Sequence, residues 1–242
     1  ANLLKWMRNY AVKNANLVIT PSNYLKDMVI SWGANPKDVH VIYNSFTPQS
    51  KVCPLKFKDR KNQIVSAGRL VPWKGMDELI KCFMEMDLPD WKLIIIGDGP
   101  CYNSLQELIH KLNASDKIKL LGRLDKGELY KVLTNSKVFV LNSTYEGLPH
   151  VILEAFYCKI PVVASKAGGT PELVIDGQTG LLFQPGDIET LKHSIYQLIE
   201  NPELCNTLVT NAYQRLIKDF NPEKMFNLYD KHIQQILKHG TC

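Results

Sequence analysis

The chain has 242 residues, of which 45% are hydrophobic and 22% charged, which is typical of a globular protein and not of a disordered one. Its basic excess is small, with 29 Lys and Arg against 24 Asp and Glu. The basic residues neither follow one helix face nor alternate with aromatics, which argues against a nucleic-acid partner. No apolar run approaches the length of a membrane span.

Six cysteines are scattered along the chain, without a CxxC pair or the Cys and His spacing of a zinc site. Several lie inside apolar patterns, as in IKCFM and EAFYC, where a free cysteine behaves as a small core residue. This usage favours a reducing compartment over a disulfide framework. With no signal-peptide pattern at the first residues, we expect a cytoplasmic protein, and we leave open a peripheral contact with the inner face of a membrane.

The first elements in chain order are two short strands with a helix between them. Residues 17–22 (LVITPS) and 39–45 (VHVIYNS) have strand patterns, and residues 23–33 form a helix that Gly33 closes. Two strands are too few for an independent α/β core. We therefore expect residues 1–46 to be the remnant of a preceding domain.

A basic, proline-containing stretch comes next, and we expect a linker over residues 47–62. Most of its charge lies in KVCPLKFKDRK (51–61). A solvated linker is the favoured interpretation of this stretch, and a contact with anionic lipid is the weaker one.

Beyond residue 62, apolar runs of four to six residues bounded by glycine alternate with segments of helical period, which indicates βαβ units. The fold class is therefore α/β, a doubly wound Rossmann-like parallel sheet with a short remnant of a second α/β domain. From Ile188 on, the pattern is almost entirely helical. Three segments, TPE (170–172), NPE (201–203) and NPE (221–223), each place a capping side chain before a proline at an expected helix start. The expected strands are QIVSAGRL, WKLIIIGDG, IKLLGRL, KVFVLNST and PVVASKAGG, and the expected helices DELIKCFMEM, NSLQELIHKL, KGELYKVLTNS and VILEAFYC.

Ligands of an open parallel sheet bind at the carboxyl ends of its strands, and four such ends carry suggestive residues. In SAGRLVPWKGMDELI (66–80), Arg69 follows the strand and Lys74 precedes a helix. Two cations beside a helix N-terminus favour a phosphate, although two solvated surface charges fit the pattern equally well. In IIIGDGP and LLGRL, Gly97 and Gly122 could expose backbone to a ligand or simply make tight turns; the dinucleotide fingerprint around Gly97 lacks its third glycine.

The fourth strand end leads into EGLPHVILEA (146–155). Glu146 lies in the loop, and the helix begins near Pro149 or His150, with Glu154 about 6 Å along its axis. Glu154 interrupts an apolar face, and a buried acid there needs a polar partner. Two carboxylates on either side of one bound ligand suit the vicinal hydroxyls of a sugar or ribose. The alternative is one Glu offsetting the helix dipole and one in water, and we favour the hydroxyl-binding interpretation.

Motifs for other chemistries are missing from the sequence. There is no GxSxG, HExxH, Walker loop or DxD pair. The histidines are dispersed, and only His150 is notable, by position alone.

Taken in order, GRLVPWKG, GDGP, LGRL, STYEGLPHVILEA and PVVASKAGGTPELVIDGQTGLLFQPGD resemble the donor-binding half of the retaining GT-B glycosyltransferases of family four (glycosyl transferases group 1), over about residues 63–187. Glu146 and Glu154 fit the E-x7-E signature of that family. Residues 15–45 resemble the end of the acceptor half and the hinge. The resemblance implies a donor-binding domain over residues 63–220, and we expect the helix of residues 221–242 to pack back on the N-terminal part.

The resemblance also implies roles for single residues. Arg69 and Lys74 would hold the donor diphosphate and neutralise charge on the leaving group in place of a metal, which is consistent with the missing DxD pair. Glu154 would accept hydrogen bonds from the ribose, and Glu146 would contact the transferred sugar. The other donor-binding residues would be Gly97, Gly122 and Arg123, the latter two near the base, and Gly147, Leu148, Pro149 and His150.

The implied reaction transfers a hexosyl unit from a UDP- or GDP-sugar to an acceptor hydroxyl with retention, in the synthesis of a cell-surface glycan or glycolipid such as lipopolysaccharide or capsule. The resemblance implies no cofactor and no metal. The chain departs from the family at the hinge, where NSFTP (44–48) replaces Asn-Gly-Val-Asp, and no acceptor-side Gly-rich loop is found, so this chain alone is expected to be incomplete. The alternatives are a nucleotide-sugar epimerase of the same fold and a donor-binding module that needs a partner chain; a Rossmann oxidoreductase is disfavoured by its incomplete fingerprint.

Overall fold

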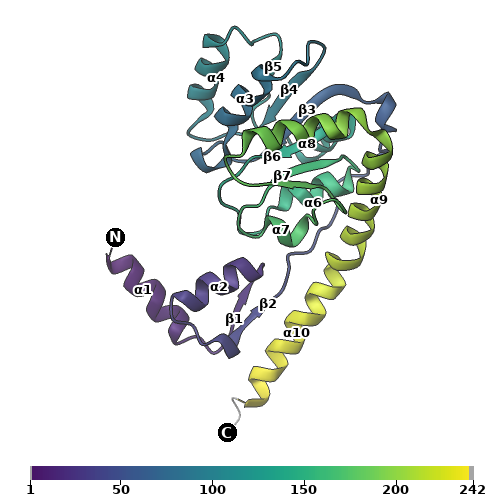
Figure 1. Cartoon of the computed structure of the whole chain (residues 1–242). Coiled ribbons are helices and arrows are strands. Elements are labelled where there is room, and N and C mark those ends of the chain that lie inside the picture. The colour runs from purple at the N-terminus through teal and green to yellow at the C-terminus, as the bar shows by residue number, and fades with distance from the viewer. Residues whose placement is uncertain (1, 240–242) are drawn as a thin grey trace. The chain divides into compact units, whose positions relative to one another are not determined.

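The computed structural model describes residues 2–239, which divide into two compact units (Figure 1). The smaller unit combines the N-terminal residues through Thr47 with the residues from Ile217 on, and the larger unit is Pro48–Leu216. The domain bounds expected from the sequence stay a prediction.

The smaller unit is built around two short parallel strands, β1 (Val18–Thr20) and β2 (Val39–Val41). Between them lies α2 (Asn23–Ser31), which begins where the Ser22 side chain accepts a hydrogen bond from the Leu25 amide. The unit also contains the helices α1 (Asn2–Lys13) and α10 (Pro222–His239) and a 3-10 turn at Pro36–Asp38. The two strands and the helix predicted at the start of the chain are therefore confirmed, although both strands are shorter than expected.

The C-terminal helix contacts the first strands of the same unit. The Phe46 amide donates to the Phe220 carbonyl at 2.7 Å, just before α10 begins. Along α10, the ring of His232 lies on the ring of His40 with 4.0 Å between centroids.

The larger unit contains one six-stranded parallel sheet in the order β5-β4-β3-β6-β7-β8. The predicted doubly wound α/β fold is confirmed by this order: the chain runs outward from β3 to β5, returns to β6 beside β3, and runs outward again to β8. The strands are β3 (Lys61–Ala67), β4 (Lys92–Ile96), β5 (Ile118–Leu120), β6 (Ser136–Leu141), β7 (Val162–Ser165) and β8 (Leu181–Phe183).

Helices cover both faces of the sheet, which explains why its central strands are continuous apolar runs. On one face, α3, α4 and α8 pack with Ile64, Leu93 and Val138 into one hydrophobic core. Strand residues of the other parity, such as Val65 and Phe139, are equally buried, and α5 and α6 contact β3, β6 and β7. The helices are α3 (Met76–Glu85), α4 (Tyr102–Lys111), α5 (Lys126–Asn135), α6 (His150–Tyr157), α7 (Thr170–Leu173), α8 (Ile188–Glu200) and α9 (Pro202–Asp219).

Two of the three predicted proline caps are confirmed. The side chains of Asn201 and Asn221 accept hydrogen bonds from backbone amides three residues later, at 2.9 and 2.8 Å. The prediction for Thr170 is wrong, because α7 begins at Thr170 itself and Gly169 is its N-cap. The Thr170 hydroxyl therefore lies inside the helix, buried and without a hydrogen-bond partner among the described residues.

The expectation of a solvated basic linker is wrong at Arg60, which is only 6% exposed. Its guanidinium donates to the carbonyls of Leu55 at 3.1 Å, Ser136 at 3.1 Å and Lys159 at 2.8 Å. Ser136 is the C-cap of α5, and Lys159 directly follows Cys158, the C-cap of α6. The guanidinium therefore lies at two helix C-termini, and their partial negative charge takes the place of a carboxylate. Burial lowers the pKa of Arg60 to about 10.

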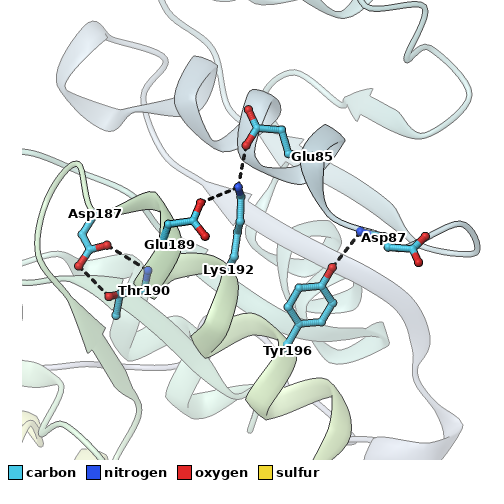
Figure 2. Close-up of polar contacts among 7 residues, drawn as sticks. All are labelled: Glu85, Asp87, Asp187, Glu189, Thr190, Lys192 and Tyr196. Carbon is cyan, nitrogen blue, oxygen red and sulfur yellow. Dashed lines mark hydrogen bonds and ion pairs between the residues drawn. The ribbon is translucent and has the colours of Figure 1, made fainter.

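A polar cluster joins α8 to the end of α3 (Figure 2). Lys192 on α8 bonds to Glu85 of α3 at 2.7 Å and to Glu189 at 2.9 Å, and these carboxylates raise its pKa. One turn further along α8, the Tyr196 hydroxyl accepts a hydrogen bond from the Asp87 amide at 2.8 Å. The cluster therefore fixes the helical layer over one face of the sheet.

None of the helices in the described residues combines the length and the apolar character that crossing a membrane requires.

Candidate active site

The carboxyl ends of β3 and β6 lie side by side, at the point where the strand order reverses. Arg69 and Lys74 follow β3, and Glu146 follows β6. Open α/β sheets bind ligands at such a switch point, because the loops diverge there and leave a crevice. The loops that carry these three predicted residues therefore leave the sheet at its switch point.

Backbone packing fixes the position of Lys74. It ends a 3-10 turn at Pro72–Lys74, and Gly75 follows with φ 60°. A Cβ atom at Gly75 would lie 2.3 Å from the carbonyl oxygen of Asn142, so only glycine fits between the two loops. Asn142 in turn donates from its amide to the Gly75 carbonyl at 3.0 Å, which joins the loop after β3 to the loop after β6.

Lys74 and Glu146 form an ion pair at the centre of this arrangement. Lys74 Nζ lies 2.5 Å from Glu146 Oε1, and the Ser143 hydroxyl donates to the same oxygen at 2.6 Å. The side chains are 14% and 9% exposed, so the interpretations of a solvated lysine and of a glutamate in water are both wrong. The Gly169 amide donates to the Glu146 carbonyl at 2.9 Å, which adds the loop after β7 to the site.

Glu154 lies in the middle of α6 and is 4% exposed. Its carboxylate forms an ion pair with Lys126, the first residue of α5. The sequence predicted that Glu154 needs a polar partner but did not identify Lys126. The available signal was a lysine in the first turn of a helix, where the macrodipole disfavours a cation.

A hollow of about 450 Å³ lies beside β3 and β4. Its lining includes three predicted residues, Arg69, Gly97 and Arg123, together with Asp98. Gly97 has φ 140°, and a Cβ atom there would lie 1.8 Å from the Gly68 carbonyl oxygen, so close backbone packing alone requires a glycine at this position. Two arginines against one carboxylate leave the hollow with a positive balance.

The remaining predicted residues lie in the same loops. Gly122 has φ 68° with open space where a Cβ would point, and its carbonyl accepts a hydrogen bond from the Gly97 amide at 2.8 Å. Helix α6 begins at His150, as predicted, with Pro149 as its N-cap. Pro149 is buried, His150 is exposed, and Gly147 and Leu148 are half-buried.

The described residues thus form three local groups: Lys74 with Glu146, Lys126 with Glu154, and Arg69 with Gly97 and Arg123. Sequence reasoning missed Ser143 and Asn142 as well as Lys126. Within the part of the chain that the structure describes, no three His, Cys, Asp or Glu residues are grouped so that they could hold a metal ion.

The doubly wound sheet has the Rossmann-like architecture of a GT-B glycosyltransferase domain. The model of the family described as Glycosyl transferases group 1 matches residues 51–215, and the chain belongs to this family. The resemblance found in the sequence is therefore confirmed.

Relatives agree with this assignment. An uncharacterized glycosyltransferase of Methanocaldococcus jannaschii is 34% identical over 91% of this chain and 60% of its own length. A GDP-mannose-dependent monoacylated alpha-(1-6)-phosphatidylinositol monomannoside mannosyltransferase of Corynebacterium glutamicum is 33% identical over 64% of this chain and 43% of its own. The crystal structure of Anabaena Alr3699/HepE in complex with UDP has a TM-score of 0.83 and 28% identity, over 94% of this chain and 66% of that one. The chain thus spans about three fifths of the length of the first of these relatives.

Proposed function

We propose that this chain is the donor-binding part of a retaining glycosyltransferase, which transfers a hexosyl unit from a nucleoside diphosphate sugar to an acceptor hydroxyl. The observation that carries the proposal is the Lys74–Glu146 ion pair at the β3/β6 switch point, 14% and 9% exposed, with Arg69 in the same loop as Lys74. The cation suits a ligand with negatively charged phosphates, and the carboxylate beside it suits a ring that bears hydroxyl groups. A nucleoside diphosphate sugar has both.

The diphosphate would interact with the cations. Arg69 and Arg123 line the hollow of about 450 Å³, and Lys74 lies further along the same loop as Arg69. Guanidinium groups bind phosphate oxygens with two hydrogen bonds each, and fixed positive charge stabilises the negative charge that develops on the leaving diphosphate. Because these side chains supply that charge, we propose that transfer proceeds without a divalent cation.

The sugar and the ribose would interact with the carboxylates. Ser143 and Lys74 fix one oxygen of Glu146, which orients the carboxylate for the hydroxyls of the transferred sugar. Glu154 would accept hydrogen bonds from the ribose hydroxyls, and Gly122 would lie near the base. The backbone amides of Gly147, Leu148 and His150, with Pro149 between them as the N-cap, would face the donor because helix N-termini favour anions.

The names of the relatives supply candidates for the donor base and the acceptor. One relative is described as GDP-mannose-dependent and one solved structure contains UDP, so both nucleotides are candidates for this chain. We propose a glycan or glycolipid acceptor of the cell surface and a cytoplasmic location, with contact at the inner face of a membrane. The five cysteines within the described residues are free, which fits a reducing compartment.

A second candidate is a donor-binding module that needs a partner chain for transfer. This chain covers 60% of the length of the M. jannaschii relative, so the activity of the whole relative is not carried over to it. Binding without turnover of any donor would distinguish this module from a complete transferase.

Isothermal titration of the chain with uridine and guanosine diphosphate, in buffer containing a chelator, tests the proposal. We expect one nucleotide to bind, Arg69→Met to weaken it, and Glu154→Ala to weaken it by about 1–3 kcal/mol, because the ribose loses hydrogen bonds to a charged acceptor. Lys192→Met, on the α3–α8 face, is the matched control and should bind as the wild type does. Unchanged affinity in Glu154→Ala, or a strict need for magnesium, would contradict the proposal. A thermal-shift panel of nucleotide sugars then identifies the sugar.

A further inference from the structure

The Lys126–Glu154 ion pair joins two helices that start at different strand ends. Lys126 opens α5 after the loop of β5, and Glu154 lies in α6 after the loop of β6. The same helices also meet at Tyr130 and Tyr157, whose rings pack edge-on with centroids 5.6 Å apart. The Glu154 side chain is 6% exposed and that of Lys126 44%, so the lysine extends from solvent to a buried carboxylate.

The start of α5 does not need Lys126. Asp125 and Glu128 form a complete capping box, in which each side chain accepts from the other residue's backbone amide. A lysine at the first helical position is disfavoured by the positive end of the helix dipole. Its contact with Glu154 therefore offsets an unfavourable position, and it compensates a carboxylate that would otherwise be buried without a cation.

The hydrogen bond from Lys126 goes to only one oxygen of the carboxylate. Among the described residues, the Glu154 side chain accepts one hydrogen bond, from Lys126 Nζ to Oε1. Oε2 and the second lone pair of Oε1 remain available to further donors. Fixing one oxygen of a carboxylate sets the plane and direction of the other.

We propose that Lys126 is a positioning residue for recognition of the donor ribose: it holds the Glu154 side chain in one orientation, so that the carboxylate accepts hydrogen bonds from the 2′- and 3′-hydroxyls. This proposal rests on the proposed function, in which Glu154 binds the ribose. The ion pair has no net charge, so Glu154 can accept hydrogen bonds without repelling the diphosphate held by Arg69.

The test compares uridine diphosphate with 2′,3′-dideoxyuridine diphosphate, or the guanosine pair if guanosine diphosphate is the nucleotide that binds. The ratio of the two affinities measures ribose recognition alone, because any change in attraction for the phosphates affects both ligands equally. The wild type should prefer the ribose form by roughly 10- to 100-fold. Lys126→Met should reduce that ratio by about fivefold or more, within the range of couplings between contacting residues.

Matched variants separate positioning from charge and from folding. Lys126→Arg, which keeps a donor and a charge, should retain the wild-type ratio, and Arg69→Met should weaken both ligands with the ratio unchanged. In a Glu154→Gln background, Lys126→Met should change the ratio no further. Circular dichroism and thermal unfolding of each variant show whether it is folded, and Lys126→Gln replaces Lys126→Met if the latter does not fold.

The two failures are distinguishable. If the wild type binds neither nucleotide, or binds both forms of one nucleotide equally, the proposed function fails and this inference with it. If the wild type prefers the ribose form while Lys126→Met keeps that ratio or raises it, the proposed function stands and the positioning role of Lys126 is overturned.

Discussion

Replacing Arg60 by methionine should destabilise the larger unit more than any exposed substitution in the basic stretch. The guanidinium bonds to three carbonyls at 3.1 Å or less, and a fourth, that of Cys158, lies at 3.5 Å. A hydrogen bond to a charged group contributes about 1.5–3 kcal/mol, and a buried carbonyl left without a partner costs about 1–3 kcal/mol. Methionine fills part of the volume but donates nothing.

Two effects reduce the loss below the sum of these contributions. Burial lowers the pKa of Arg60 to about 10, so removing the charge relieves a desolvation cost. The adjacent cavity of about 270 Å³, which Arg60 helps to line, is large enough to admit water to some of the carbonyls. We therefore expect the free energy of unfolding to fall by about 3–5 kcal/mol, because three carbonyls lose a charged donor.

Urea denaturation followed by circular dichroism measures this loss, provided that the m-value is unchanged. Lys58→Met is the matched control, because Lys58 is exposed in the same stretch and its replacement should change stability by less than about 0.5 kcal/mol. Arg60→Lys should recover only part of the stability, because an ammonium lacks the planar fork that reaches three directions. A loss below about 1 kcal/mol in Arg60→Met would refute the reasoning, since it would mean that water serves the carbonyls as well as the guanidinium does.

Two further predictions concern a close backbone contact and the buried thiols. Gly97→Ala should lower the free energy of unfolding by about 2–4 kcal/mol, because its Cβ would lie 1.8 Å from a carbonyl oxygen. The control is Gly177→Ala, which has φ 69° and open space around it and should cost only about 1–2 kcal/mol. Equal losses of the two variants in urea denaturation would contradict the steric argument. Iodoacetamide at pH 8 should alkylate the exposed Cys53 in the native chain but should modify the three buried cysteines only after unfolding, and peptide mass spectrometry measures the difference. Burial raises the pKa of the three buried thiols to about 12, which leaves roughly one thiol in 10,000 ionised at this pH. These thiols hold their protons more tightly in the folded than in the unfolded chain, so the free energy of unfolding should also fall as the pH rises above the ordinary value of 9.0; a constant value there would contradict the shifts. The buried cysteines are Cys82, Cys158 and Cys205.

The sheet could be predicted because its signals are local. Each central strand is an apolar run ended by glycine or a polar residue, and β4 and β6 lie within the predicted segments WKLIIIGDG and KVFVLNST. The rule that ligands bind at strand ends then selected Arg69, Lys74 and Glu146 without knowledge of any contact. The structure pairs Lys74 with Glu146 at the junction of β3 and β6, and it places Arg69, from the same loop as Lys74, in the hollow beside β3 and β4.

Features that depend on distant residues could not be predicted. Arg60 bonds to carbonyls that are 76 and 99 residues further along the chain, and a sequence window over the basic stretch contains neither of them. Lys126 finds Glu154 on another helix, 28 residues away. The basic composition of residues 51–61 suggested a solvated charge at Arg60, since Arg and Lys are usually exposed, and tertiary contacts bury it instead. Lys126 stays largely exposed, and only its contact with Glu154 was missed.

Helix α6 connects these distant contacts to the site. Its N-terminus follows the loop that carries Glu146, and its C-terminal carbonyls are held by Arg60 beyond the opposite, amino-terminal end of the sheet. The helix has eight residues, so the two ends are about 12 Å apart. Because Glu154 lies between them and must meet Lys126 on α5, the direction of its carboxylate depends on anchors at both ends of the helix. Loops alone could not hold this geometry, since Arg60 also fixes the end of α5 through the Ser136 carbonyl and thereby sets the spacing of the two helices that carry the ion pair.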